Sequence, residues 1–183
     1  MKKYRKYPFV LLLRKTTKVY FWAKHNYKLN MITSIESLPA EKQQVLYDAI
    51  PYVTLLVAGA DGIIEDAELE KGEKIAHVRT FHFHQEWQEY YKKVDEHLHE
   101  RLLELIRTLP RSPQQCQDAI SKELSKLNTI LPLLEPKHAK HFYDGLLSFA
   151  RHVAKASGGI VGWMSIGPKE AKVADLPMIE PVE

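Results

Sequence analysis

The sequence has little cysteine and no long hydrophobic run. Its one cysteine, Cys116, excludes an intramolecular disulfide, and no histidine adjoins it, so we expect an inert or partly buried thiol. The apolar run at residues 9–13 is too short for a membrane span or an ordinary signal peptide. Arg14 and Lys15 interrupt that run. We therefore expect a cytoplasmic protein.

The common catalytic signatures are also missing. There is no phosphate-binding Gly-x-x-x-x-Gly-Lys, no Gly-x-Ser-x-Gly and no dinucleotide fingerprint after a strand. Three histidine pairs occur: His82 and His84, His97 and His99, and His138 and His141. None has the Cys or His–Glu pattern of a zinc site, so surface histidines are the better interpretation. We expect no catalysis.

Acidic residues are absent from the first thirty positions, which hold nine Lys and Arg. The remaining 153 residues carry 17 basic and 23 acidic side chains, so the net charge of +3 for the whole chain hides an acidic main part. The slight overall basicity is therefore not evidence for nucleic-acid binding, and we expect no nucleic-acid partner.

Residues 1–30 are predicted to be a basic extension outside the core, and residues 31–183 a single domain. A basic, aromatic stretch suits peripheral contact with an anionic membrane surface. It also suits loose nucleic-acid binding. Alternatively, Met31 is the natural start and the stretch is translated from an upstream codon, an interpretation we rank level with the membrane one.

Apolar residues recur at helical spacing through the main part, and no segment alternates as a strand does. Helices are expected from residue 37, over 65–80, over 85–109 and over 168–176, with Pro51 either opening a helix or kinking one. The predicted buried stripes are Trp87, Tyr91, Val94, Leu98, Leu102, Leu105 and Leu109; Ile120, Leu124, Leu127 and Leu131; and Phe142, Leu146, Phe149 and Val153. The predicted fold class is a compact all-α domain.

An acidic loop at residues 58–68 separates an apolar helix, 51–58, from a charged one. Gly59 and Gly62 are expected to end the apolar helix, because glycine enters left-handed backbone regions without steric cost. With Glu65 as the N-cap, Glu68 falls at the third helical position and completes a capping box. In this interpretation the acids only stabilise a helix start.

The same loop has the pattern of half an EF-hand. Loop positions 5, 6, 8 and 12 are taken by Asp61, Gly62, Ile64 and Glu68. Val57 and Gly59 replace the first two carboxylates, so this is no EF-hand. The loop instead predicts a site for a divalent, calcium-like hard cation, completed by water or by a second loop.

The predicted primary ligands are Asp61 and Glu68, with Glu65 and Asp66 as auxiliary ligands. A second loop is expected after the helix at 142–156, where Ser165 and Glu170 would contribute oxygens. Ile166 and Glu170 repeat the Ile-x-x-x-Glu spacing of Ile64 and Glu68, so the chain is predicted to contain two copies of one helix–loop–helix unit. We expect helices 51–60 and 142–157 to be neighbours, with their loops at one end.

These two motifs, Ala58-Gly-Ala-Asp-Gly-Ile-Ile-Glu-Asp-Ala-Glu68 and Ala154-Lys-Ala-Ser-Gly-Gly159 with Ile166-x-x-x-Glu170, resemble the TerB family of tellurite-resistance proteins. The resemblance covers residues 38–179 and lacks an Asp in its second copy. It implies a compact helical domain whose acidic clusters are proposed to bind divalent metal, in bacteria, with a link to stress and tellurite resistance.

Three functions follow as expectations. The first is a TerB-like, metal-binding or metal-responsive domain without catalysis. The second is a protein–protein interaction module whose acidic loop is only a helix cap, with an unidentified protein partner. The third, a metal-dependent hydrolase, is the weakest, because no nucleophile or base accompanies the acids.

Overall fold

The computed structural model describes residues 34–62, 64–157 and 168–183. Within these ranges the regular elements are all helical, so the predicted fold class is confirmed. The α-helices are α2 (Ala40–Ala58), α3 (Asp66–His82), α4 (Gln85–Thr108), α5 (Pro113–Ser125), α6 (Pro136–Ser157) and α7 (Pro168–Ala174). The 3₁₀ turns are η1 (Ile35–Ser37), η2 (Gly59–Asp61), η3 (Lys126–Thr129) and η4 (Leu131–Leu133). Residues 1–30, the predicted basic extension, lie outside the described residues.

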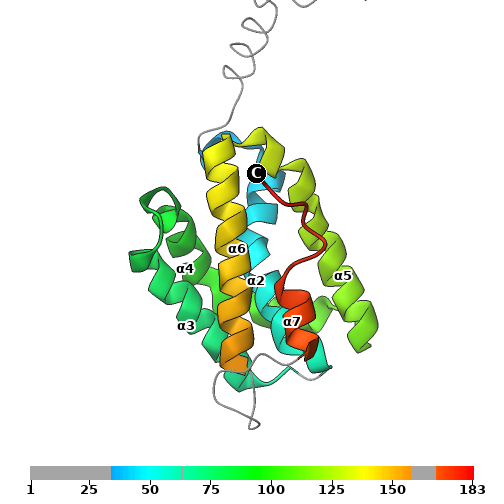
Figure 1. Cartoon of the computed structure of the whole chain (residues 1–183). Helices are drawn as coiled ribbons and strands as arrows, with labels where there is room; N and C mark the ends of the chain where they lie inside the picture. Colours follow the sequence, from blue (N-terminus) through cyan, green and yellow to red (C-terminus); the bar gives the residue numbers. More distant parts are fainter. Residues whose placement is uncertain (1–33, 63, 158–167) are drawn as a thin grey trace, which may run out of the picture. The chain divides into compact units, whose positions relative to one another are not determined.

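Helix α2 is the centre of the domain. Its second half is buried on almost every side, the pattern of a helix surrounded by other helices. It contacts α3, α4, α5, α6 and α7, and α6 runs beside it along its length (Figure 1). Pro51 lies inside this one helix, which decides between the two predicted roles of that proline. None of the described helices is both long and apolar enough to cross a membrane.

Two contacts attach α4 to α2 near the proline. Pro51 has no N–H to donate, which leaves α2 short of one backbone hydrogen bond. Tyr90 on α4 donates its hydroxyl to the carbonyl of Leu46 at 2.8 Å, and burial raises the pKa of Tyr90, which keeps it a donor. Nearby, Arg101 holds both carboxylate oxygens of Asp48 at 2.8 Å, and those bonds raise the pKa of Arg101.

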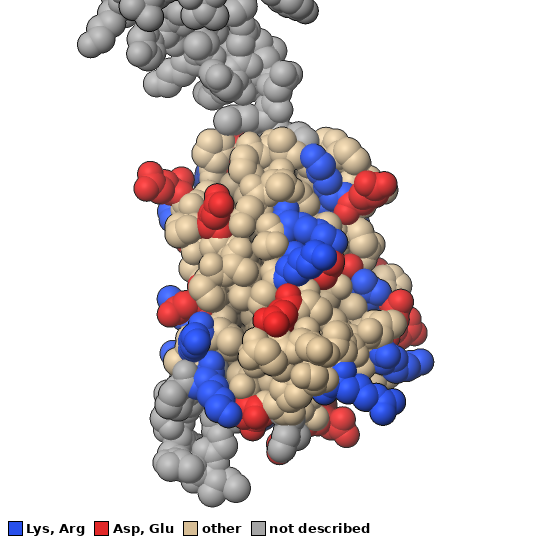
Figure 2. Space-filling view, turned by 90° about the vertical axis from the view of Figure 1, so that its right-hand side faces the viewer, with Lys and Arg blue, Asp and Glu red and all other residues tan. Residues whose placement is uncertain are grey.

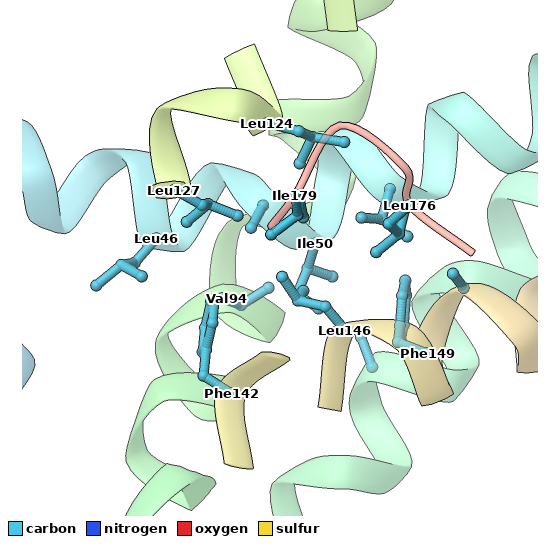
Figure 3. Close-up of a cluster of buried hydrophobic side chains, with 14 of the residues drawn as sticks. Leu46, Ile50, Val94, Leu124, Leu127, Phe142, Leu146, Phe149, Leu176 and Ile179 are labelled. Carbon is cyan, nitrogen blue, oxygen red and sulfur yellow. The ribbon is translucent and has the colours of Figure 1, made fainter. Parts of the chain in front are cut away.

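The predicted apolar stripes lie inside. The α4 stripe is buried apart from Leu109, which is partly buried, and the structure adds Tyr90 to it. Figure 3 shows side chains from α2, α4, α5 and α6 converging on one cluster. The stripe from Ile120 to Leu131 is also buried, but its α-helix ends at Ser125 and continues as 3₁₀ turns. Pro132 disfavours α geometry in the residue before it, so an α-helix could not continue through this segment to Leu133.

Two glycines bring α3 close to its neighbours. A Cβ atom on Gly72 of α3 would lie 2.5 Å from Thr54 Cγ2 of α2. A Cβ atom on Gly145 of α6 would lie 2.8 Å from Phe83 Cζ, just after α3. Atoms do not approach this closely, so only glycine permits these helix spacings. The close approach sets α3 directly beside α6.

Helices α2 and α6 have the arrangement that the sequence predicts. These helices are neighbours, both end at the same end of the domain, and α7 contacts η2 there (Figure 1). The predicted neighbour relation is therefore confirmed. The repeat itself remains a prediction, because residues 158–167, including Ser165 and Ile166, lie outside the described residues.

The C-terminal segment is part of the core. The sequence predicts only a last helix that ends at Leu176 and does not predict this burial. Helix α7 ends at Ala174, and Leu176 takes a left-handed φ of 47° that turns the chain inward. Leu176 and Ile179 are 0% and 2% exposed. Asn128 donates to the carbonyl of Met178 at 3.1 Å and accepts from the N–H of Glu180 at 2.9 Å, which fixes the segment against η3.

Candidate functional site

The predicted acidic corner consists of Asp61, Glu65, Asp66 and Glu68. Asp61 ends η2, and Gly62 follows with a φ of 100°, the left-handed conformation expected of a glycine there. Glu65 is the N-cap of α3, and its N–H donates to the carboxylate of Glu68 at 3.4 Å. The capping box predicted from the sequence is therefore present.

The four carboxylates of the corner differ in their exposure to water. Asp61, Glu65 and Asp66 are exposed, whereas Glu68 is partly buried. Nowhere in the described part of the chain do three or more His, Cys, Asp or Glu side chains form a group suited to a metal ion. Glu170 lies in α7, which contacts η2, but its side chain is outside the description. The cation site stays a prediction, and it would need water or Glu170.

A groove of about 450 Å³ lies between α3 and α6, in a different place from the acidic corner. We call it the α3–α6 groove. Its lining residues are Lys71, Lys74, Ile75, Val78, Arg79, His82, Phe83, Ser148 and His152. None of the described residues that line it is acidic. Its volume is within the range of ligand-binding clefts, so this groove is a second candidate site.

Arg79 forms the inner wall of the groove and is only 7% exposed. One terminal nitrogen, Nη1, donates to the hydroxyl of Tyr91 at 3.0 Å and to the carbonyl of Gly145 at 2.8 Å. The other, Nη2, donates to the hydroxyl of Ser148 at 3.1 Å. Arg79 thus connects α3, α4 and α6 through neutral partners.

Aromatic rings surround the guanidinium. Its central carbon lies 5.1 Å from the ring centre of Phe83, 5.6 Å from Tyr91 and 5.4 Å from Phe149. Burial raises the pKa of Tyr91, an effect that Arg79 opposes. Tyr91 therefore stays a neutral phenol at neutral pH and brings no negative charge. Cation–π contacts of this kind offset part of the cost of burying the cation.

Apolar surface continues outward from the groove along α3. Val78 is 49% exposed and Phe81 is 64% exposed, the most exposed of the large hydrophobic side chains in the described residues. The ring of Phe81 lies edge-to-face with the ring of His77, at 5.6 Å between ring centres. Leu103 and Ile106 on α4 are exposed to a smaller extent. Val78 lines the groove itself, and Phe81 lies three residues further along α3, next to Val78 on the helix surface.

The other titratable clusters have structural roles. Asp48 and Arg101 hold α2 to α4 beside a smaller cavity of about 280 Å³. The rings of His84 and His141 stack at 4.2 Å, which links the α3–α4 turn to α6. Cys116 is partly buried, as expected, and burial raises the pKa of its thiol.

The sequence interpretation missed Arg79, although a signal existed. Buried positions on α3 recur at residues 69, 72, 76 and 79, steps of three and four, and the partly buried Phe83 continues the series. An arginine on such an apolar stripe indicates a buried cation. Treating α3 simply as a charged helix concealed this position.

Comparison of the chain with protein-family models, with curated proteins and with solved structures finds no match. The site is therefore argued from its own residues.

Proposed function

We propose that this chain is a non-catalytic protein-binding domain whose binding surface is the α3–α6 groove. The observation that carries the proposal is the exposure of Phe81 and Val78 beside a groove with a buried arginine. Removing a large apolar side chain from water contributes about 1.5–3 kcal/mol, so a partner gains by covering these two. Contiguous exposed apolar surface of this kind is typical of interaction sites.

The polar groups in the groove favour binding over catalysis. Ser148 and His152 are adjacent, with 3.5 Å between Ser148 Oγ and His152 Nδ1. However, His152 Nδ1 lies 2.6 Å from the carbonyl oxygen of Ser148, which only accepts, so that nitrogen carries the hydrogen. It cannot accept the serine proton, as a general base must. Ser148 Oγ instead accepts from Arg79, which supports a binding role.

A photo-crosslinking experiment tests this proposal. We expect p-benzoylphenylalanine in place of Phe81 to form a discrete protein adduct in the host cell, because a partner that covers the groove lies against this side chain. The matched control places the same residue at Ile106, an exposed apolar position on α4. Equal adducts at both positions, or none at Phe81, would show that the groove is not a protein-binding surface.

The TerB-like metal-binding function is the second candidate. It is supported by the acidic corner, where Glu65 caps α3 and Asp66 and Glu68 stand in its first turn, and by the contact of α7 with η2. A bound cation would relieve the repulsion among these acids. The link to tellurite resistance and bacterial stress rests on the family resemblance alone, and we propose a cytoplasmic location with peripheral membrane contact through residues 1–30.

Melting curves with and without millimolar calcium, magnesium or manganese test the cation site. If the site binds, the free energy of unfolding should rise by about 2.7 kcal/mol at a hundredfold excess of ligand over Kd. Asp61→Asn and Glu68→Gln should each remove most of this gain, while Gln at position 68 keeps an acceptor for the N–H of Glu65. If the wild-type curve does not move, the corner is a helix cap only.

A further inference from the structure

We infer that the α3–α6 groove binds an acidic amphipathic helix of a partner protein. In this complex one partner carboxylate pairs with Arg79, and partner apolar side chains cover Val78 and Phe81. The inference rests on the proposed function and adds the chemistry of the partner to it.

The first argument is the charge on Arg79. A buried cation is costly unless an anion accompanies it, typically by several kcal/mol. Among the described residues Arg79 has no carboxylate within ion-pair distance, and its partners are two hydroxyls and a carbonyl. A guanidinium has five N–H donors, of which these bonds use three. A carboxylate entering the groove would supply both the missing charge and acceptors for the remaining donors.

The second argument is the positive charge along the rim of the groove. Lys71 and Lys74 line it from α3, and His152 lines it from α6, with Lys155 one turn further on. The main part of the chain is acidic overall, so this gathering of cations is local. On the face shown in Figure 2, in contrast, Lys and Arg are interspersed with Asp and Glu.

Three acidic residues on the helices around the groove have cationic or histidine partners, and among the described residues no carboxylate, that of Glu70 on α3 included, forms an ion pair with Lys71 or Lys74. Asp144 pairs with Lys140 at 3.4 Å, and Asp175 pairs with Arg151 at 2.9 Å. Glu73 lies 2.8 Å from His99 on α4. These contacts leave the cations on the groove rim available to a partner.

The third argument is shape. Positions 71, 74, 78 and 82 follow one another along α3 at steps of three and four, so they form one stripe of about three turns, or about 16 Å. Helix α6 forms the opposite wall and runs antiparallel to α3, since Gly145 lies by Phe83 and Ser148, one turn later on α6, accepts from Arg79, one turn earlier on α3. A long channel between two helices suits a third helix rather than a small carboxylate.

The terminal segments of this sequence do not have the properties of the expected partner helix. Residues 1–30 contain no acid, so their charge repels the groove. The acidic C-terminal segment is anchored elsewhere, with Leu176 and Ile179 in the core. Neither end of this chain therefore supplies the acidic helix.

Two fluorescein-labelled synthetic peptides of about 18 residues, or five helical turns, test the inference on the full chain. In both peptides the leucines are spaced alternately three and four residues apart, so that they form one stripe along the helix. One has glutamates beside this stripe and the other has glutamines. We expect the acidic peptide to bind at least about tenfold more tightly by fluorescence anisotropy, which corresponds to about 1.4 kcal/mol. Added salt should reduce the difference.

Variants place the binding in the groove. The double variant Lys71→Glu with Lys74→Glu should bind the acidic peptide at least about tenfold more weakly. If melting shows that this variant folds poorly, the neutral double variant Lys71→Gln with Lys74→Gln is used in its place. The control, Lys122→Glu with Lys172→Glu, makes the same charge change at exposed positions on α5 and α7 and should change Kd less than about twofold. Arg79→Met should abolish the difference between the two peptides.

Several outcomes overturn the inference. Equal binding of the two peptides that Phe81→Ser abolishes would show an apolar groove without acid selectivity, and the proposed function would stand. Binding of decanoate, or of anionic vesicles, in place of the acidic peptide would assign the groove to a small carboxylate or a membrane. Failure of both peptides together with no adduct at Phe81 would remove the inference and the proposed function together.

Discussion

Replacing Phe149 with alanine is expected to lower the free energy of unfolding by about 3–5 kcal/mol, whereas Phe81→Ala changes it by less than about 0.5 kcal/mol. Phe149 is fully buried on α6 and lies beside the guanidinium of Arg79. Its truncation leaves a cavity that the packed helices cannot close. Phe81 is 64% exposed, so its truncation leaves no cavity.

Urea unfolding of the two variants and the wild type measures this contrast. The two changes remove the same side chain from two helices, so their difference isolates burial. A loss above about 1 kcal/mol in Phe81→Ala would mean that this side chain packs inside, and Phe81 would no longer mark a binding surface. A loss in Phe149→Ala as small as a surface substitution would contradict its place in the core.

The exposed Phe81 and the buried Arg79 both indicate a binding surface. Neither side chain is fully used by the isolated domain: Phe81 leaves apolar area in water, and Arg79 places a cation among rings and neutral acceptors. Features of this kind persist where binding benefits from them. Their proximity on α3, at positions 79 and 81, is why we assign the binding surface to this helix.

The helices could be predicted because local rules decide them. The α4 stripe repeats at steps of three and four over 24 residues, longer than any competing pattern. The capping box at Glu65 and Glu68 needs only a spacing of three residues. Such features depend on neighbours in the sequence, and tertiary packing has little scope to override them.

The candidate groove could be predicted only in part. A cation on the buried stripe at Arg79 is visible in the sequence, but its partner Gly145 is 66 residues away. The groove exists because Gly72 and Gly145 let α3 approach two different helices, and no local pattern encodes which helices those are. The acidic corner, in contrast, is prominent in the sequence because its acids are consecutive, and consecutive acids suit a helix start as well as a cation.

The C-terminal segment illustrates the same limit. Pro177 correctly indicated that helix α7 stops nearby, but a proline gives no information on where the chain goes next. The inward turn depends on the left-handed φ of Leu176, which is uncommon for leucine, and on Asn128, some fifty residues earlier. Long-range hydrogen bonds and burial together hold a conformation that leucine alone does not favour.

Ending the chain after Ala174 is therefore expected to lower the free energy of unfolding by about 4–8 kcal/mol, since truncating a buried leucine or isoleucine costs about 2–5 kcal/mol. The deletion removes Leu176 and Ile179 from the core and leaves the amide of Asn128 without two partners. A loss of this size is a large fraction of the stability of an ordinary domain.

A loss of about 4–8 kcal/mol is comparable to the whole stability of a domain, so Leu176→Ala provides the measurable case, with an expected loss of about 2–5 kcal/mol. The control is Glu180→Gln, an exposed side chain whose backbone N–H keeps its bond to Asn128, and it should stay within about 0.5 kcal/mol of wild type. Urea unfolding followed by circular dichroism compares the three proteins. If Leu176→Ala unfolds at the same urea concentration as Glu180→Gln, the segment after α7 does not close the core, and the stability of the domain resides in α2 to α6 alone.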